Sequence, residues 1–405
     1  MRTKEWSFAA GTPIMTELLG KSKEELREFC VALGEPAFRG AQIYHALYSE
    51  GKFDVAQITN LPEVLRERLT KEARITLPEV KQRFTSTDGS VRYLLWLGAA
   101  VEPKEFNVPI GSGRAPHTEG GENAAKNGGE RAGRLGKPAS VEAVFMPSEG
   151  RQTICVSTQA GCAVDCHFCL TAQLGLIRNL TAGEIVAQVL LPLEEHKAQL
   201  APQTNIVLMG QGEPLLNFEP VMAAVRIMLD PEGLGISAKH VTLSTSGIVP
   251  GIERLAQERV RPKLAISLNA SNDEQRDALM PINKKYPLSV LMDACKKYPL
   301  RTWEHLTFEY VMLGELNDAE EDAQRVVRLL APLKSVKVNL IPWNPEELPY
   351  RESSAERIEE FRRILVERGV RTFVRYSRGR DVMAACGQLA LLQIDGSPLP
   401  VVSAQ

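Results

Sequence analysis

Short apolar segments alternate with longer amphipathic segments from residue 141 to near the C-terminus, and this alternation is the strongest constraint on the fold. The apolar segments read as strands at 152–158, 204–210, 240–246, 263–269, 306–313, 336–342 and 371–377. Segments such as 181–196 and 354–369 lie between them and have helical spacing of apolar residues. Repeated strand–helix units with apolar strands predict a parallel sheet. We expect an α/β fold with a partial (β/α) barrel, and a doubly wound sheet is the alternative.

Unusual polar sequences follow four of these predicted strands. They lie at residues 210–214, 244–247, 267–271 and 338–345. The carboxyl ends of barrel strands are where the active sites of such folds lie. The four segments therefore predict one shared active-site opening, or mouth, at the carboxyl ends of the strands.

The rest of the chain divides by composition. Residues 1–78 predict a helical accessory domain, in which Ser22 and Glu25 resemble a capping box. Residues 79–140 predict a β-hairpin linker around Asp88-Gly89, with a Gly-rich insertion at 106–139. We expect this insertion to be flexible, because it lacks the apolar residues to offset its ordering entropy. A phosphate-binding loop is the rejected alternative, since no strand leads into it and no helix follows. The barrel is expected over residues 141–395, with a tail at 396–405.

Composition limits the class of protein. The 405 residues carry a formal net charge of −2, so nothing global predicts a nucleic-acid partner. The N-terminus lacks the apolar run of a signal peptide, and no apolar stretch approaches the ~20 residues of a membrane span. We therefore expect a cytoplasmic protein with no membrane contact. Seven clustered cysteines indicate metal or redox chemistry rather than a disulfide framework.

Three of the cysteines, Cys162, Cys166 and Cys169, are spaced C-x3-C-x2-C. Zinc and an iron–sulfur cluster are the candidates. A closed zinc site needs four ligands, and His167 is poorly placed to share an ion with the adjacent Cys166. A cubane cluster normally takes four cysteines, so three leave one iron open to a small molecule. The spacing favours the cluster.

This spacing, with Phe168 before the last cysteine, resembles the radical S-adenosylmethionine (SAM) superfamily. The resemblance implies a 4Fe-4S cluster whose open iron is chelated by the amino and carboxylate groups of SAM. An electron from the reduced cluster then cleaves the sulfonium and releases a 5′-deoxyadenosyl radical. The cofactor carries that chemistry, while the protein holds it dry and oriented.

A wider resemblance covers nearly the whole chain except residues 106–139. The matching segments occur in family order at 155–169, 209–217, 242–252, 264–271, 339–345 and 378–389. They are similar to the adenosine-C2 RNA methyltransferases of the RlmN type, and residues 35–48 resemble the accessory domain of that family. The resemblance implies methylation of adenosine C2 in 23S rRNA and in tRNA, by a monomer with a reducing electron donor such as a flavodoxin.

The resemblance also implies roles for three further residues. Cys386 is methylated by a first SAM, a radical from a second SAM activates that methyl group, and the base becomes bonded to Cys386. Cys155 then attacks the Cys386 sulfur, which forms a disulfide and releases the base. Glu142 matches the proton acceptor of the family. Without the resemblance, Cys155 and Cys386 would each be interpreted as a buried structural cysteine, and Glu142 as a surface residue.

Cofactor contacts follow from the same match. Gly212 and Glu213 correspond to the motif that meets the amino group of SAM. The further cofactor positions are Ser244, Ser267, Leu268, Asn269 and Asn339. Ser and Asn at strand ends are otherwise common capping residues. Asn269 departs from the better-known members, which carry His there, and Leu170 replaces a small hydroxyl residue.

The arginines near Cys386 have more than one possible role. They are Arg368, Arg371, Arg375, Arg378 and Arg380. They can lower a thiol pKa, form a solvated face or contact RNA phosphates, and we favour RNA contacts. For the whole protein, the competing functions are C8 methylation of the same adenosine, a radical enzyme without an RNA substrate, and a zinc-stabilised binding module.

Overall fold

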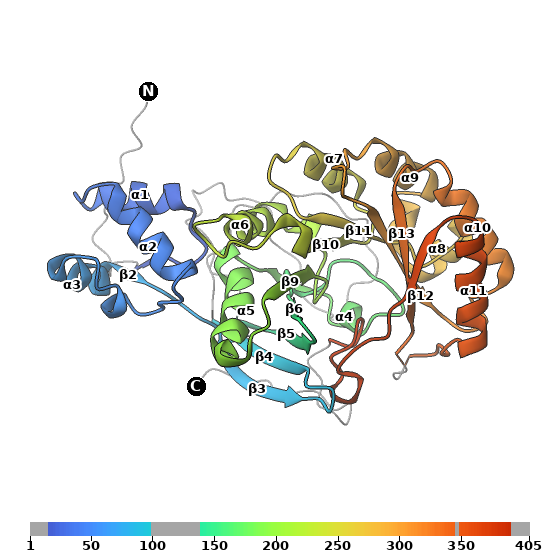
Figure 1. The fold of residues 1–405 in the computed structure, drawn as a ribbon, viewed down its shortest axis with the longest axis horizontal. Helices are drawn as coiled ribbons and strands as arrows, with labels where there is room; N and C mark the ends of the chain where they lie inside the picture. The colour runs from blue at the N-terminus through green and yellow to red at the C-terminus, as the bar shows by residue number, and fades with distance from the viewer. Residues whose placement is uncertain (1–14, 99–137, 345–347, 390–405) are drawn as a thin grey trace, which may run out of the picture.

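A computed structural model describes residues 15–98, 138–344 and 348–389 (Figure 1). Most of the Gly-rich insertion and all of the predicted tail at 396–405 lie outside the described residues. No helix in the described ranges is long and apolar enough to cross a membrane.

A small helical module forms the N-terminal part of the described chain (Figure 1). Its elements are β1 Thr16–Glu17, α1 Lys23–Ala32, α2 Phe38–Tyr48, the 3-10 segment η1 Val55–Gln57, α3 Glu63–Glu72 and β2 Ala73–Arg74. The predicted capping box is present, because Ser22 and Glu25 exchange side-chain and backbone hydrogen bonds. Helices α1 and α2 approach closely at Gly40, where an added Cβ would lie 2.3 Å from the backbone nitrogen of Arg27. Tyr44 ties the module to the rest of the protein through a 2.9 Å hydrogen bond to Asp230.

Ten strands form one sheet, in the order β14-β13-β12-β11-β10-β9-β6-β5-β4-β3. Their bounds are β3 Glu79–Thr85, β4 Val91–Leu97, β5 Ala139–Ser148, β6 Arg151–Cys155, β9 Gln203–Leu208, β10 Val241–Thr245, β11 Lys263–Ser267, β12 Leu306–Met312, β13 Val336–Pro342 and β14 Arg371–Val374. The strands from β6 to β14 pair in parallel, as predicted. The hairpin β3–β4 and strand β5 extend the same sheet in antiparallel fashion.

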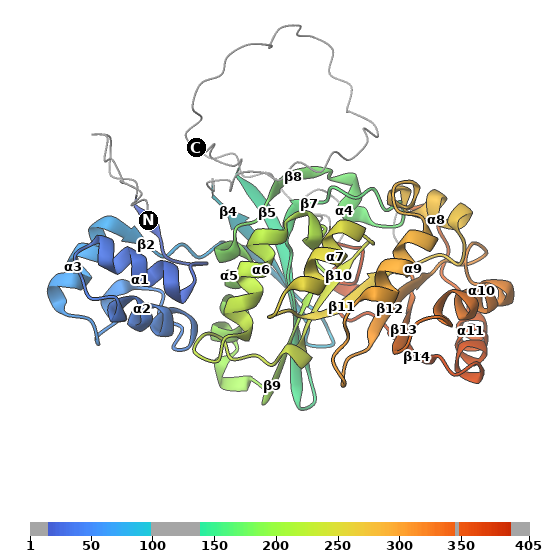
Figure 2. The same ribbon diagram turned by 90° about the horizontal axis from the view of Figure 1, so that it is seen from above.

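Helices cover the convex face of the sheet (Figure 2). They are α5 Ala182–Glu195, α6 Phe218–Leu229, α7 Val249–Gln257, α8 Asp273–Leu279, α9 Leu288–Lys297, α10 Glu320–Leu330 and α11 Ala355–Glu367. Short 3-10 segments lie at η2 Lys197–Gln199, η3 Pro214–Leu216, η4 Ala238–His240, η5 Pro281–Lys284 and η6 Arg380–Val382. The strands at the two ends of the sheet, β3 and β14, do not pair with each other, so the predicted partial barrel is confirmed.

Strand periodicity decides which side chains face the site. In β13, Val338 and Leu340 are fully buried in the main apolar core. Ile341 lines a cavity on the other face. Successive side chains of a strand point to opposite faces, so Lys337 and Asn339 share the concave face with Ile341.

One hairpin was not predicted. It joins β7 Gln159–Gly161 to β8 Leu176–Asn179 and encloses the cysteine loop and the short helix α4 Leu170–Gln173. The Cys162 amide donates to the Gly175 carbonyl at 2.9 Å, which closes the base of the loop.

Candidate active site

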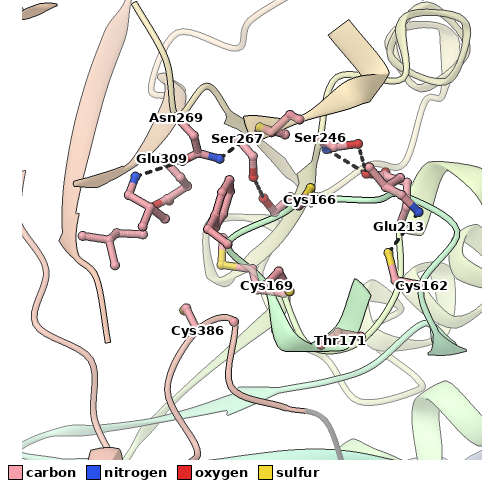
Figure 3. Close-up of a pocket in the computed structure, with 18 of the residues that line it drawn as sticks. Cys162, Cys166, Cys169, Thr171, Glu213, Ser246, Ser267, Asn269, Glu309 and Cys386 are labelled. Carbon is pink, nitrogen blue, oxygen red and sulfur yellow. Dashed lines mark hydrogen bonds between the residues drawn. The ribbon is translucent and has the colours of Figure 1, made fainter. Parts of the chain in front are cut away.

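The four polar segments predicted to share a mouth do line one cavity. It lies at the carboxyl ends of the parallel strands, between the sheet and the cysteine loop (Figure 3). Residues from every one of the four segments contribute to the lining, among them Gly212, Glu213, Ser244, Ser267 and Asn344. The prediction of one shared mouth is confirmed.

All three motif cysteines line this cavity. Burial raises the pKa of Cys162 to about 12 and that of Cys166 well above its ordinary value. Burial also raises the pKa of Cys169. The charge of Cys169 further opposes ionisation of the other two, so the sulfur atoms are near enough to repel as thiolates. A bound cation would relieve this repulsion, which is what a metal cluster supplies.

The three sulfur atoms do not converge on one point. In the described part of the chain, no three His, Cys, Asp or Glu side chains lie close enough to share a single metal ion. A cubane cluster takes its cysteines on separate irons, so its ligands need no common point.

Glu213 lies buried on the far side of the cavity from Cys386 (Figure 3). Its carboxylate accepts hydrogen bonds from the Ser246 amide at 2.7 Å and the Ser246 hydroxyl at 2.8 Å. Burial raises the pKa of Glu213, and the bonds from Ser246 oppose that rise. The preceding Gly212 has φ +97°, and a Cβ there would lie 2.5 Å from the Gln159 side chain. Only glycine fits this turn without strain.

Asn269 and two serines line the strand side of the cavity. The Ser244 and Ser267 hydroxyls lie 3.4 Å apart. Asn269 has φ +53°, a left-handed conformation that Asn tolerates better than most residues. Its side-chain oxygen accepts from the Val311 amide at 2.9 Å, which fixes the turn after β11.

Two predicted cofactor residues do not line the cavity. Leu268 is fully buried in the apolar core. Asn339 instead donates to Glu309 at 2.9 Å. Leu268 thus lies behind the cavity wall, whereas Asn339 lies on the concave face and holds the cavity-lining Glu309.

Glu309 is a site residue that sequence reasoning missed. It lies in the middle of β12, lines the cavity and is 5% exposed. Its Oε2 has no hydrogen-bond partner among the described residues. Burial raises the pKa of Glu309 and the charge of Arg375 lowers it. An acidic residue within the apolar segment 306–313 was the available signal.

A second cavity adjoins the first, and Cys386 lines both. Cys155 lines the second cavity with Cys386. Both thiols are free, as are the other five cysteines. Cys386 is accessible from the cavity although protein surrounds it. The fold therefore brings Cys155 and Cys386 to one shared space.

Arg375 lies beside both thiols and lines both cavities. Burial raises the pKa of Cys155 to about 12, the charge of Cys386 adds to this, and Arg375 opposes it. Burial likewise raises the pKa of Cys386, and Arg375 is the group that most lowers it. Of the other arginines in the series, Arg378 also lines the second cavity and pairs with Asp88 at 3.3 Å, whereas Arg380 pairs with Glu352 at 3.4 Å.

Glu142 lies outside the lining of both cavities. It is fully buried on β5 and forms an ion pair with Arg92 at 2.7 Å. The Gln211 side-chain nitrogen lies 3.5 Å from its other carboxylate oxygen. Gln211, which directly precedes Gly212, therefore brings that loop into contact with the Glu142 carboxylate.

Two parts of this chain, the helical N-terminal module and the barrel, match two different protein families. Residues 156–327 match the radical SAM superfamily, and residues 16–75 match the family described as ribosomal RNA large subunit methyltransferase N-terminal domain. A protein of Koribacter versatilis named probable dual-specificity RNA methyltransferase RlmN is 47% identical over 88% of this chain and 96% of its own length. The dual-specificity RNA methyltransferase RlmN of Anaeromyxobacter dehalogenans is 41% identical over 94% of each chain. The crystal structure of a radical SAM methyltransferase from Sphaerobacter thermophilus superposes with a TM-score of 0.77, at 38% identity over 93% of this chain and 99% of that one.

Proposed function

Because this chain belongs to the RlmN family of radical SAM RNA methyltransferases, we propose that it methylates C2 of adenosine in 23S rRNA and in tRNA. The observation that carries the proposal is the position of Cys386, which lines both the cavity of the motif cysteines and the cavity of Cys155. C8 methylation is not favoured, since the relatives named above are RlmN proteins.

The first cavity fits the cofactors of the family. Cys162, Cys166 and Cys169 would hold a 4Fe-4S cluster, and Glu213 and Asn269 would contact SAM. The bound cluster and SAM supply a 5′-deoxyadenosyl radical. Two observations support the fit: the thiols are grouped closely enough to repel one another, and the same cavity is lined by Glu309, whose buried Oε2 has no partner among the described residues.

Cys386 is the proposed methyl carrier. Adenine C2 is electron-poor and has no lone pair that attacks a methyl sulfonium, whereas a thiolate attacks it readily. The Cys386 sulfur takes the methyl group of one SAM substrate, which leaves as S-adenosylhomocysteine. A second SAM is consumed in activating that methyl group, so each turnover uses two. Arg375 favours the thiolate form that this displacement needs.

Cys155 is the proposed resolving thiol. The base is released when the Cys155 thiolate attacks the Cys386 sulfur and a disulfide forms. The sulfur–carbon bond then breaks with its electron pair on the carbon, which takes up a proton and becomes the methyl group of the product. Both cysteines are free in the structure and face the same cavity, which supports this pairing.

Glu142 is the proposed proton acceptor. Its carboxylate is held by Arg92 behind Gln211, so the proposal requires Gln211 to move when the base enters. We further propose a monomer in the cytoplasm, where thiols stay reduced, with a flavodoxin-type protein as electron donor.

Three measurements test the proposal. Nucleoside analysis of rRNA and tRNA treated with the anaerobically purified enzyme should find 2-methyladenosine; methylation at C8 alone would overturn it. The purified protein should contain iron and sulfide, and a colourless zinc-loaded protein would exclude the cluster. Mass spectrometry should find an added methyl group on the Cys386 peptide.

A further inference from the structure

Basic side chains follow one another along the concave face of the sheet, from the amino ends of the strands toward Cys386. Lys263 begins β11, Lys337 lies near the start of β13, and Arg371 begins β14. Lys337 and Arg371 are register partners on neighbouring strands. At the far end of the row is Arg375, which lines both active-site cavities.

The charges of the row act on one another. Burial lowers the pKa of Lys263, and the charge of Lys337 lowers it further. Burial also lowers the pKa of Lys337, and Arg375 and Arg371 add to that effect against the attraction of Glu309. The cations are therefore close enough to repel, which makes the face costly to leave without a counter-ion.

Carboxylates offset the charge of the row only in part, because Glu309 attracts Lys337 without forming a direct ion pair with it. Within the described ranges, Lys263, Lys337 and Arg371 form no ion pair within 4 Å of a carboxylate oxygen. The nearby Glu304 attracts Lys263 but already lies 3.5 Å from Arg301. The Nη1 atom of Arg371 lies 3.3 Å from the Nε2 atom of His305. In a chain with a net charge of −2, this is a local excess of positive charge.

Exposed aromatic rings accompany these cations. Phe373 on β14 is 47% exposed, with the Arg371 guanidinium 5.6 Å from its ring centre. Trp303, in the loop before β12, is 36% exposed and lies near Lys239 and Arg301, at 5.6 and 5.3 Å. We call the combined set the amino-end strip: Lys239, Lys263, Arg301, Trp303, Lys337, Arg371 and Phe373.

We propose that the amino-end strip binds the single-stranded RNA that flanks the target adenosine. Its cations contact the phosphates, and Phe373 and Trp303 stack on unpaired bases. Unstacked RNA is recognised by this combination of positive charge and aromatic rings. The row ends at Arg375, beside the cysteine that would carry the methyl group, so RNA bound along the strip leads into the site. The inference rests on the proposed RNA substrate.

The test measures the salt dependence of RNA binding by the holoenzyme. The variants are the double substitution Lys263→Gln/Lys337→Gln, the charge-retaining Lys263→Arg/Lys337→Arg, and a matched control, Lys296→Gln/Lys297→Gln, on the exposed end of α9. Fluorescence anisotropy follows binding of a labelled tRNA and a labelled 23S rRNA stem–loop across a salt series. Every phosphate that a variant no longer neutralises should lower the slope of log affinity against log salt by about 0.7, hence by about 1.4 for the double variant.

The expected result is weaker binding and a smaller slope for the glutamine pair only, with thermal unfolding unchanged in all variants. A wild-type slope in a folded Lys263→Gln/Lys337→Gln protein would overturn the inference. Weaker binding of the glutamine pair to anionic lipid vesicles, with RNA binding unchanged, would also overturn it. Failure of the proposed function looks different, because then the wild-type enzyme itself would transfer no methyl group to RNA.

Discussion

Cys155 and Cys386 face the same cavity as free thiols although they lie at opposite ends of the barrel domain in sequence. Cys155 is the last residue of β6, and Cys386 lies in the loop after η6. The two thiols share a cavity because the C-terminal loop crosses from β14 back to the antiparallel end of the sheet. There Asp381 accepts hydrogen bonds from Ser86 at 2.5 Å and from the Thr87 amide at 3.0 Å.

Replacing Cys155 with Ala should stall the reaction at a covalent protein–RNA adduct. Without this thiolate, the bond between the Cys386 sulfur and the new carbon has no nucleophile to cleave it. Denaturing gels with labelled RNA would show the adduct. Cys295→Ala, which alters a buried cysteine on α9 away from both cavities, should turn over normally. Normal product release by Cys155→Ala would refute the resolving role.

Replacing Arg375 with Gln should slow methylation of Cys386 and move its pH dependence to higher pH. Burial raises the pKa of the Cys386 thiol and Arg375 lowers it, so removing the cation raises that pKa further. Methylation needs the thiolate, so the rate lost below the thiol pKa returns as pH rises. We expect a loss of about tenfold to a hundredfold at neutral pH, which is the size of effect that one neighbouring opposite charge has on ionisation.

The measurement is the rate of methyl transfer to Cys386 across a pH series, read by mass spectrometry. Arg375→Lys should recover part of the rate, because it restores the charge. Arg368→Gln, an exposed arginine at the end of α11, is the matched control. An unshifted pH profile for Arg375→Gln would show that Arg375 does not act on the thiol.

The Arg92–Glu142 pair gives a prediction about stability. Both side chains are fully buried, 2.7 Å apart. Arg92→Met should destabilise the protein by about 3–5 kcal/mol, because it leaves a buried carboxylate without its cation. The double variant Arg92→Met/Glu142→Leu should recover much of that loss, since neither member of the charged pair then remains in the core. Urea unfolding measures both, and equal losses would contradict the argument.

Features that depend on neighbouring residues could be predicted from the sequence, whereas contacts between residues far apart in the chain could not. The parallel strands were predicted because each is a continuous apolar segment, and the cysteine loop was predicted from local spacing. The Arg92–Glu142 pair was not, since it arises from the register of β4 on β5, where Leu94 pairs with Glu142 across the Gly-rich insertion. Glu309 and Arg375 were not assigned to the site because neither stands in a local motif, and only the order of β12 and β14 brings them beside Cys386. The hairpin β7–β8 was missed because its strands are short and the cysteine loop separates them.

The close approach of α1 and α2 allows a prediction for the accessory module. A Cβ on Gly40 would lie 2.3 to 2.5 Å from backbone atoms of Leu26 and Arg27, which cannot move aside as a flexible side chain would. Gly40→Ala should therefore separate the helices and destabilise the module by about 3 kcal/mol. His45→Ala, at an exposed position of the same helix, should change stability by less than about 0.5 kcal/mol. Limited proteolysis within residues 16–75 and thermal unfolding would report the difference, and equal protection of the two variants would show that the helices can accommodate the methyl group.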